Sequence, residues 1–227
     1  MGRSKKMKTT GKQFSKQRSR IRGFSLIELV LAVAVIMILA AFAIPNFTSA
    51  MHTAHLKGVV SDYSGLLQNE RIRAVGDDRY YSAYIIGNSP SEAFVDIYPQ
   101  QTNGASGTGG TAVNPNDPLI PINNEIRQKA VGTAPNTSSL QLLLLPANSP
   151  VVPLDGSSTA SPPTFGPRGL PCKPLSGVCD TLGGPQAYWT FFQNTVTQQW
   201  GAVTITPAGR IQRWIYTGGP TGIWVSY

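Results

Sequence analysis

One carboxylate inside a long apolar run is the feature that most constrains how this chain can fold. Residues 29–44 include no polar side chain, and with residues 24–28 they approach the roughly 20 residues that a membrane-spanning helix needs. Glu28 is the fifth residue of this stretch, counted from Phe24. A carboxylate at mid-bilayer costs roughly 2.5 to 3.5 kcal/mol on insertion scales. The sequence therefore predicts an N-terminal membrane helix whose Glu28 is neutralised by a group outside the free monomer.

The segment ahead of this helix is strongly basic. Residues 1–22 carry nine Lys or Arg and no acidic residue, so the positive-inside rule keeps them in the cytoplasm. The formal charge of +8 comes from this segment, because the chain from Phe24 onward holds ten Lys or Arg against eleven Asp or Glu. Overall basicity therefore gives no support for DNA binding, and only a local basic patch could do so.

The junction between the basic segment and the apolar helix resembles the class III signal of type IV prepilins. Its elements here are Gly23, then Phe24, then Ser-Leu-Ile-Glu-Leu at residues 25–29, with Pro45 further along. The resemblance implies that a prepilin peptidase cleaves after Gly23 and methylates the new N-terminal residue, Phe24. It also implies that Glu28 sets subunit registry by pairing with the terminal amine of a neighbouring subunit. Pro45 is expected to kink the helix.

Two other interpretations of this segment remain open. It could be an ordinary secretory signal cleaved near Ala41-Phe42-Ala43, which fits the small-residue pattern of such sites. Glu28 and the Gly23–Phe24 junction argue against that interpretation. It could also be a simple N-terminal anchor, in which Glu28 would have no role.

The helix is expected to continue well beyond the apolar half. Apolar residues recur at helical spacing through residues 47–76, which predicts one face packed on a globular head. This stripe consists of Leu56, Val59, Val60, Tyr63 and Leu67. Gly76-Asp77-Asp78 is a stop signal. The predicted organisation is a cleaved leader at 1–23, a membrane or filament-core half at 24–46, an amphipathic half at 47–76 and a β-rich head at 77–227.

The head is predicted to be mostly antiparallel sheet. Residues 79–87 and 93–98 form an expected hairpin, and residues 140–145 an expected buried strand. Four more expected strands near the C-terminus, separated by glycine-containing turns, are residues 188–192, 199–206, 210–216 and 223–227. The inserts at 99–118 and 146–163 are rich in Gly, Pro, Ser and Thr and are predicted to be loops with little to pack. The fold class is α+β, a long helix on an antiparallel sheet.

Three segments of the head resemble the domain shared by H-type pseudopilins of type II secretion and T-type minor pilins. They are residues 67–74, the Phe-Gly-Pro-Arg-Gly at 165–169, and the hairpin at 203–213. Some T-type minor pilins bind DNA through arginines of this last turn, which implies Arg210 and Arg213 as possible contacts. The spacing of these two arginines, three positions apart, departs from the family pattern. On a strand, residues three apart point to opposite faces, so the two side chains would not share one face. The competing interpretation takes both arginines as solvated, with Trp214 and Ile211 as packing residues.

Arg168 and Lys173 are further candidates for contacts with phosphate, and Trp200 or Trp214 for stacking on bases. Cys172 and Cys179 are the only cysteines and are expected to form a disulfide on the oxidising side of the membrane. A metal site at the cysteines would need two more ligands, but His52 and His55 lie on the helix close to the membrane and have no reason to approach them, so both histidines are interpreted as solvated.

No enzymatic motif is present in the sequence. It has no G-x-S-x-G elbow and no H-E-x-x-H pair, and the glycines at 104–110 are not followed by Gly-Lys-Ser/Thr. We therefore expect a structural subunit of a secretion pseudopilus or type IV pilus, without cofactor. Its partners would be prepilin peptidase, other pilins and the inner-membrane assembly platform. It would be held in the inner membrane with a periplasmic head; a DNA-binding minor pilin and an anchored envelope enzyme are the alternatives.

Overall fold

The computed structural model describes residues 25–86, 91–97, 117–145, 151–157, 161–175, 178–180, 184, 186–219 and 222–227. The chain divides into two compact units, Met1–Pro45 and Asn46–Tyr227. The predicted leader, Phe24 and most of the 99–118 insert lie outside the described residues.

The long helix predicted from the sequence is confirmed. Helix α1 spans Leu26–Gly76 and is helical through Pro45; the expected kink there stays a prediction. The chain leaves the helix at the expected stop signal, where Asp78 has a left-handed φ of 54°. All five residues of the predicted stripe are buried, from fully buried Tyr63 to Val59 at 6% exposure. Leu66, Glu70 and Ala74 extend the same buried face.

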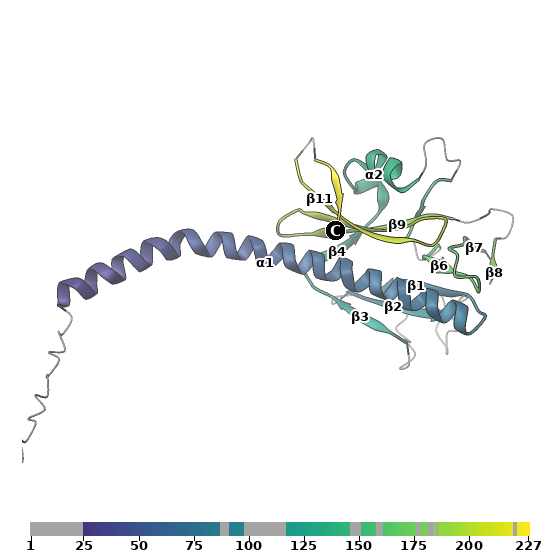
Figure 1. Cartoon of the computed structure of the whole chain (residues 1–227), viewed down its shortest axis with the longest axis horizontal. Helices are drawn as coiled ribbons and strands as arrows, with labels where there is room; N and C mark the ends of the chain where they lie inside the picture. Colours follow the sequence, from purple (N-terminus) through teal and green to yellow (C-terminus); the bar gives the residue numbers. More distant parts are fainter. Residues whose placement is uncertain are drawn as a thin grey trace, which may run out of the picture. The chain divides into compact units, whose positions relative to one another are not determined.

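The head contains two main antiparallel sheets (Figure 1). The first has the order β3-β2-β1-β6, and its β1–β2 hairpin confirms the one expected at residues 79–98. The second has the order β12-β11-β10-β9-β4, with β5 parallel to β9. The strands of the first sheet are β1 Tyr81–Ile86, β2 Ser91–Ile97, β3 Leu119–Ile122 and β6 Thr164–Phe165. Those of the second are β4 Ile126–Lys129, β5 Leu154–Asp155, β9 Tyr188–Asn194, β10 Trp200–Ile205, β11 Ile211–Tyr216 and β12 Trp224–Ser226.

The main hydrophobic core joins the second half of α1 to both sheets. Tyr63 of α1, Ala93 and Phe165 of the first sheet and Phe192 and Val203 of the second belong to one buried cluster. The aromatic rings of Tyr63 and Phe192 meet edge to face, with centroids 5.2 Å apart. Every buried hydrophobic residue in the described part of the chain lies in the unit Asn46–Tyr227. Among the described residues, the core therefore contains no side chain from the apolar half of the helix.

A second core covers the other side of the large sheet, and here one prediction is wrong. Residues 140–145 are not a strand, since helix α2 spans Thr137–Leu144 after the short 3-10 helix η1, Val131–Thr133. Leu140 and Leu144 are buried one turn apart, whereas Leu142 is 72% exposed. A run of leucines fits either a buried strand or one turn of an amphipathic helix, and this one is a helix.

The expectation that residues 146–163 have little to pack is also wrong for the described part. Leu154 of β5 packs against the main core, and Pro153, Pro162 and Pro163 are buried. Two short strands, β3 and β4, were not predicted, although Ile122 and Ile126 bury their side chains at 1% and 0% exposure. Prolines and short four-residue strands carry too little periodicity to be recognised from the sequence.

Candidate functional site

The apolar half of α1 is uncovered along its whole described length. No residue from 25 to 44 is buried, and large side chains such as Leu26 and Phe42 are 80% and 73% exposed. Among the described residues, α1 is the one helix long and apolar enough to cross a membrane. An apolar surface of this extent has to be covered by lipid or by another protein chain. The candidate functional site is therefore this helix and the signal at its start.

Glu28 lies in the first turn of α1, where its charge is favourable toward the positive end of the helix dipole. The turn is closed by the amide of Leu29, which donates to the carbonyl of Ser25 at 3.1 Å. The Glu28 side chain is exposed among exposed apolar neighbours. It is thus exposed for contact with a partner, while its registry role stays a prediction; Gly23 and Phe24 lie outside the described residues.

The two candidate DNA-contacting arginines line one hollow of about 660 Å³ beside α1. Arg210 is exposed in the turn ahead of β11, so the alternation of strand side chains does not apply to it. Arg213 is already engaged: its Nη1 donates to Ser61 Oγ at 2.9 Å, and its guanidinium lies 5.1 Å from the ring centroid of Tyr227.

The proposed base-stacking role of Trp214 does not fit the structure. Trp214 is only 5% exposed, and its indole nitrogen donates to Thr204 Oγ1 at 2.8 Å in the second core. Trp200 is half-buried against the same core. Arg168 and Lys173 are both exposed. The packing roles predicted for Trp214 and Ile211 fit, since Ile211 packs on the main core.

The three head segments that resemble pseudopilins and minor pilins meet in space. Arg71 of α1 donates to the carbonyl of Gly209 at 3.0 Å, and the amide of Phe165 donates to Glu70 Oε1 at 3.2 Å. Gly209 has a φ of 77°, and a Cβ there would lie 2.9 Å from the carbonyl oxygen of Gly169. Only glycine suits both the conformation and the close approach. The packing of these segments therefore depends on the motif residues themselves.

Glu70 is a fully buried carboxyl at the centre of this junction. Its Oε1 accepts the Phe165 amide, while its Oε2 is buried with no hydrogen-bond partner among the described residues. Burial raises the pKa of Glu70 well above its usual value of 4.5, and the backbone hydrogen bond from Phe165 only partly opposes this. Because Glu70 continues the stripe of α1, periodicity could have indicated its burial.

Cys172 and Cys179 form a disulfide, as predicted. The bridge closes a small hairpin of strands β7 Pro174–Leu175 and β8 Val178–Cys179. The carbonyl of Cys172 accepts a hydrogen bond from the buried Tyr188 hydroxyl at 2.6 Å. The hairpin is thus held to the first residue of β9 in the large sheet.

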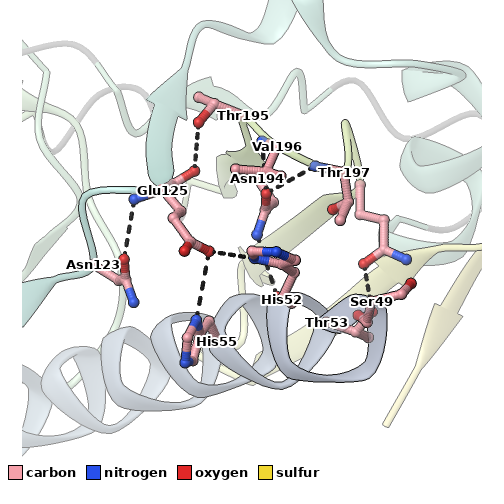
Figure 2. Close-up of polar contacts among 11 residues, drawn as sticks. Ser49, His52, Thr53, His55, Asn123, Glu125, Asn194, Thr195, Val196 and Thr197 are labelled. Atoms are coloured by element: carbon pink, nitrogen blue, oxygen red, sulfur yellow. Dashed lines mark hydrogen bonds and ion pairs between the residues drawn. The ribbon is translucent and has the colours of Figure 1, made fainter. Parts of the chain in front are cut away.

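The prediction of two solvated histidines is wrong. His52 and His55 face Glu125, which lies between β3 and β4, as Figure 2 shows. The Nδ1 atoms of His52 and His55 lie 2.7 Å and 3.5 Å from Glu125 Oε2. The hydrogen bond with His52 is the main cause that lowers the pKa of Glu125. No spacing in the sequence links Glu125 to residues some seventy positions earlier.

Comparison with known proteins identifies the N-terminal signal. The family described as the prokaryotic N-terminal methylation motif matches residues 18–44, the stretch that holds the Gly23–Phe24 junction and Glu28. No curated protein and no solved structure matches the chain. The chain therefore carries the methylation signal of type IV prepilin-like proteins, which is the substrate signal for prepilin peptidase and pilin assembly. The likeness of the head to H-type pseudopilins or T-type minor pilins stays a prediction.

Proposed function

We propose that this protein is a structural subunit of a pilus-like filament, either a secretion pseudopilin or a minor pilin. The observation that carries the proposal is the uncovered apolar half of α1, with Glu28 exposed in its first turn, under a matched methylation motif. Lipid covers this surface before assembly, and the helices of neighbouring subunits cover it in the filament. Packing of long apolar helices adds many weak contacts, and a charge pair inside such packing fixes register.

Under this proposal each of the N-terminal residues has a separate role in processing or assembly. Gly23 is the cleavage site for prepilin peptidase, and Phe24 carries the methylated terminal amine. Glu28 pairs with that amine of a neighbouring subunit, and the inner-membrane platform adds subunits. The head stays in the periplasm or on the filament surface, where its sheet and loops make contacts. The role is structural and not enzymatic.

The test compares incorporation of three variants into sheared filaments, with membrane abundance measured in parallel. Gly23→Ala should stay uncleaved in the membrane with its basic leader attached. Glu28→Ala should be cleaved normally but incorporated at least tenfold less, because removing one partner leaves the other charge buried and unpaired, at a cost of about 3 kcal/mol. Asp62→Ala, which removes an exposed carboxylate from the amphipathic half of α1, is the matched control and should assemble normally. Normal incorporation of Glu28→Ala would contradict the registry role.

A DNA-binding minor pilin is the second candidate, supported by one observation. Arg210 and Arg213 line the same hollow, so one strand of phosphates could contact both. The engagement of Arg213 with Ser61 and Tyr227 weighs against it. Filter binding over a salt series tests it: Arg210→Ala should lower the affinity and reduce the salt slope by about one. An affinity that does not depend on salt, or that Arg210→Ala leaves unchanged, would remove this candidate.

A further inference from the structure

The two histidines of the chain converge on a single carboxylate. His52 and His55 occupy one face of α1, one turn apart, and Glu125 approaches them from the segment between β3 and β4. One ring nitrogen of each histidine and a carboxylate oxygen of Glu125 all lie within 4.8 Å of one another. All three residues belong to the unit Asn46–Tyr227.

Hydrogen bonds fix the backbone segments that carry these side chains. The carbonyl of Glu125 accepts hydrogen bonds from both the amide and the hydroxyl of Thr195, at 2.7 Å and 3.0 Å. The carbonyl of His52 accepts one from the side-chain Nδ2 of Asn194 at 3.2 Å. Asn194 is fully buried, and its Oδ1 accepts from the amides of Val196 and Thr197. The turn after β9 thus fixes both the helix and the Glu125 segment, as Figure 2 shows.

The spacing of the donor atoms suits a small divalent ion. Four ligands at about 2.1 Å from a tetrahedral zinc ion lie about 3.4 Å from one another. The distance from His55 Nδ1 to Glu125 Oε2 is already 3.5 Å, and the distance from His52 Nδ1 is 2.7 Å. These two distances lie on either side of the tetrahedral spacing or close to it, and all three donors are within 4.8 Å of one another.

The chemistry of the donors selects the kind of metal. Two imidazole nitrogens and one carboxylate oxygen suit first-row transition ions such as Zn²⁺, whereas Ca²⁺ and Mg²⁺ prefer sets of oxygen ligands. The side chains of His52, Glu125 and His55 are 20%, 29% and 35% exposed, so an ion can reach them. A hollow of about 510 Å³ lies against His55, with Asp62 and Asn123 among its lining residues. Water can therefore fill the remaining coordination position.

We propose that His52, His55 and Glu125 form a binding site for one divalent transition-metal ion, with zinc as the expected occupant. The bound ion joins the start of the amphipathic half of α1 to the β3–β4 segment, so it stabilises the head. This site does not depend on filament assembly or on processing of the N-terminus.

The chain is well suited to a direct test. It has only two histidines, and both cysteines are in a disulfide, so no other imidazole or thiol competes for zinc. The experiment is zinc titration calorimetry on the untagged full chain in detergent micelles, with thermal melting in parallel. We expect one ion per chain, micromolar or tighter affinity, and a melting temperature that rises with zinc.

The variants separate binding from folding. Glu125→Gln keeps a hydrogen-bonding group beside both histidines and should weaken zinc at least tenfold without unfolding the head. His55→Gln, at the most exposed of the three positions, should do the same. Asp78→Asn, at an exposed position just beyond the C-terminal end of α1, is the control and should bind as the wild type does.

Spectroscopy supplies a readout beyond affinity. Co²⁺ in place of zinc should give visible absorption typical of a four-coordinate site, and zinc should shift the Nδ1 resonances of both histidines rather than those of Nε2. Stoichiometric zinc binding that survives Glu125→Gln and His55→Gln would overturn the proposal. So would binding of Mg²⁺ or Ca²⁺ in preference to zinc, or no binding at millimolar zinc.

Discussion

The buried carboxyl of Glu70 should make the stability of the head fall as pH rises. Its side chain is fully buried, with one oxygen accepting the Phe165 amide and the other unpartnered. Burial raises its pKa in the folded state well above the usual 4.5, so the folded chain retains a proton that the unfolded chain releases. Because the unfolded state binds fewer protons in this window, the free energy of unfolding decreases with pH.

The magnitude follows from the linkage of one proton. Between pH 4.5 and the folded-state pKa of Glu70, the free energy of unfolding should fall by about 1.4 kcal/mol per pH unit. Below pH 4.5 the contribution is fully present. Glu70→Gln imitates the protonated acid, keeps an acceptor for Phe165 and cannot titrate. The variant should therefore match the wild type near pH 4.5 and gain on it as pH rises.

The assay is urea unfolding of residues 46–227, monitored by tryptophan fluorescence at several pH values from 4.5 to 8. This segment contains every buried hydrophobic residue of the described chain. The difference between Glu70→Gln and wild type isolates Glu70, because the other titrating groups cancel. Glu70→Ala provides the structural control: relative to Glu70→Gln, which also cannot titrate, it leaves the Phe165 amide unsatisfied and should cost about 1 to 3 kcal/mol at every pH, besides the cavity. A difference between Glu70→Gln and wild type that stays constant across this range would refute the reasoning.

Three further predictions concern packing and the disulfide. Gly201 faces α1, and a Cβ there would lie 2.7 Å from Val60 Cγ2, so Gly201→Ala should destabilise the head by about 1 to 3 kcal/mol. Gly58 has open space around it, so Gly58→Ala should instead stabilise the helix by up to about 1 kcal/mol; equal effects in urea unfolding would contradict the packing. Leu140→Ala should lower the free energy of unfolding by about 2 to 5 kcal/mol, because Leu140 is fully buried. Leu142→Ala, at 72% exposure, should change it little; a larger loss for Leu142→Ala than for Leu140→Ala would contradict helix α2. Replacing both Cys172 and Cys179 by serine should lower the free energy of unfolding by about 2 to 3 kcal/mol, and a reducing agent should affect only the wild type.

The parts of the fold that sequence analysis predicted correctly have a strong periodic or covalent signal. The stripe from Leu56 to Leu67 repeats at helical spacing over several turns, and it is buried as expected. The alternating strands β9 to β12 and the two-cysteine bridge also stand out in the sequence. The same reasoning failed at residues 140–145, because an apolar run this short has no period that separates a strand from a helix.

The candidate functional residues also differ in whether a local sequence signal marks them. Gly23, Phe24 and Glu28 could be predicted because their arrangement is local in the sequence and chemically unusual; the methylation motif matches that region, and the roles of the single residues stay predictions. The contact of His52 and His55 with Glu125 could not be predicted, because it depends on how the β3–β4 segment returns to α1. Arg210 was assigned to a strand, and only the structure places it in the turn before β11.

The most direct test of the account is mass spectrometry of the chain recovered from sheared surface filaments and from membranes of the native cell. For a processed filament subunit, we expect a mature chain that begins at methylated Phe24 and is present in the sheared fraction. Scarcity there would mark a minor subunit, and dominance the main building block. A chain that keeps its leader in filaments, or that begins at Ile44 after signal-peptide cleavage, would contradict the account.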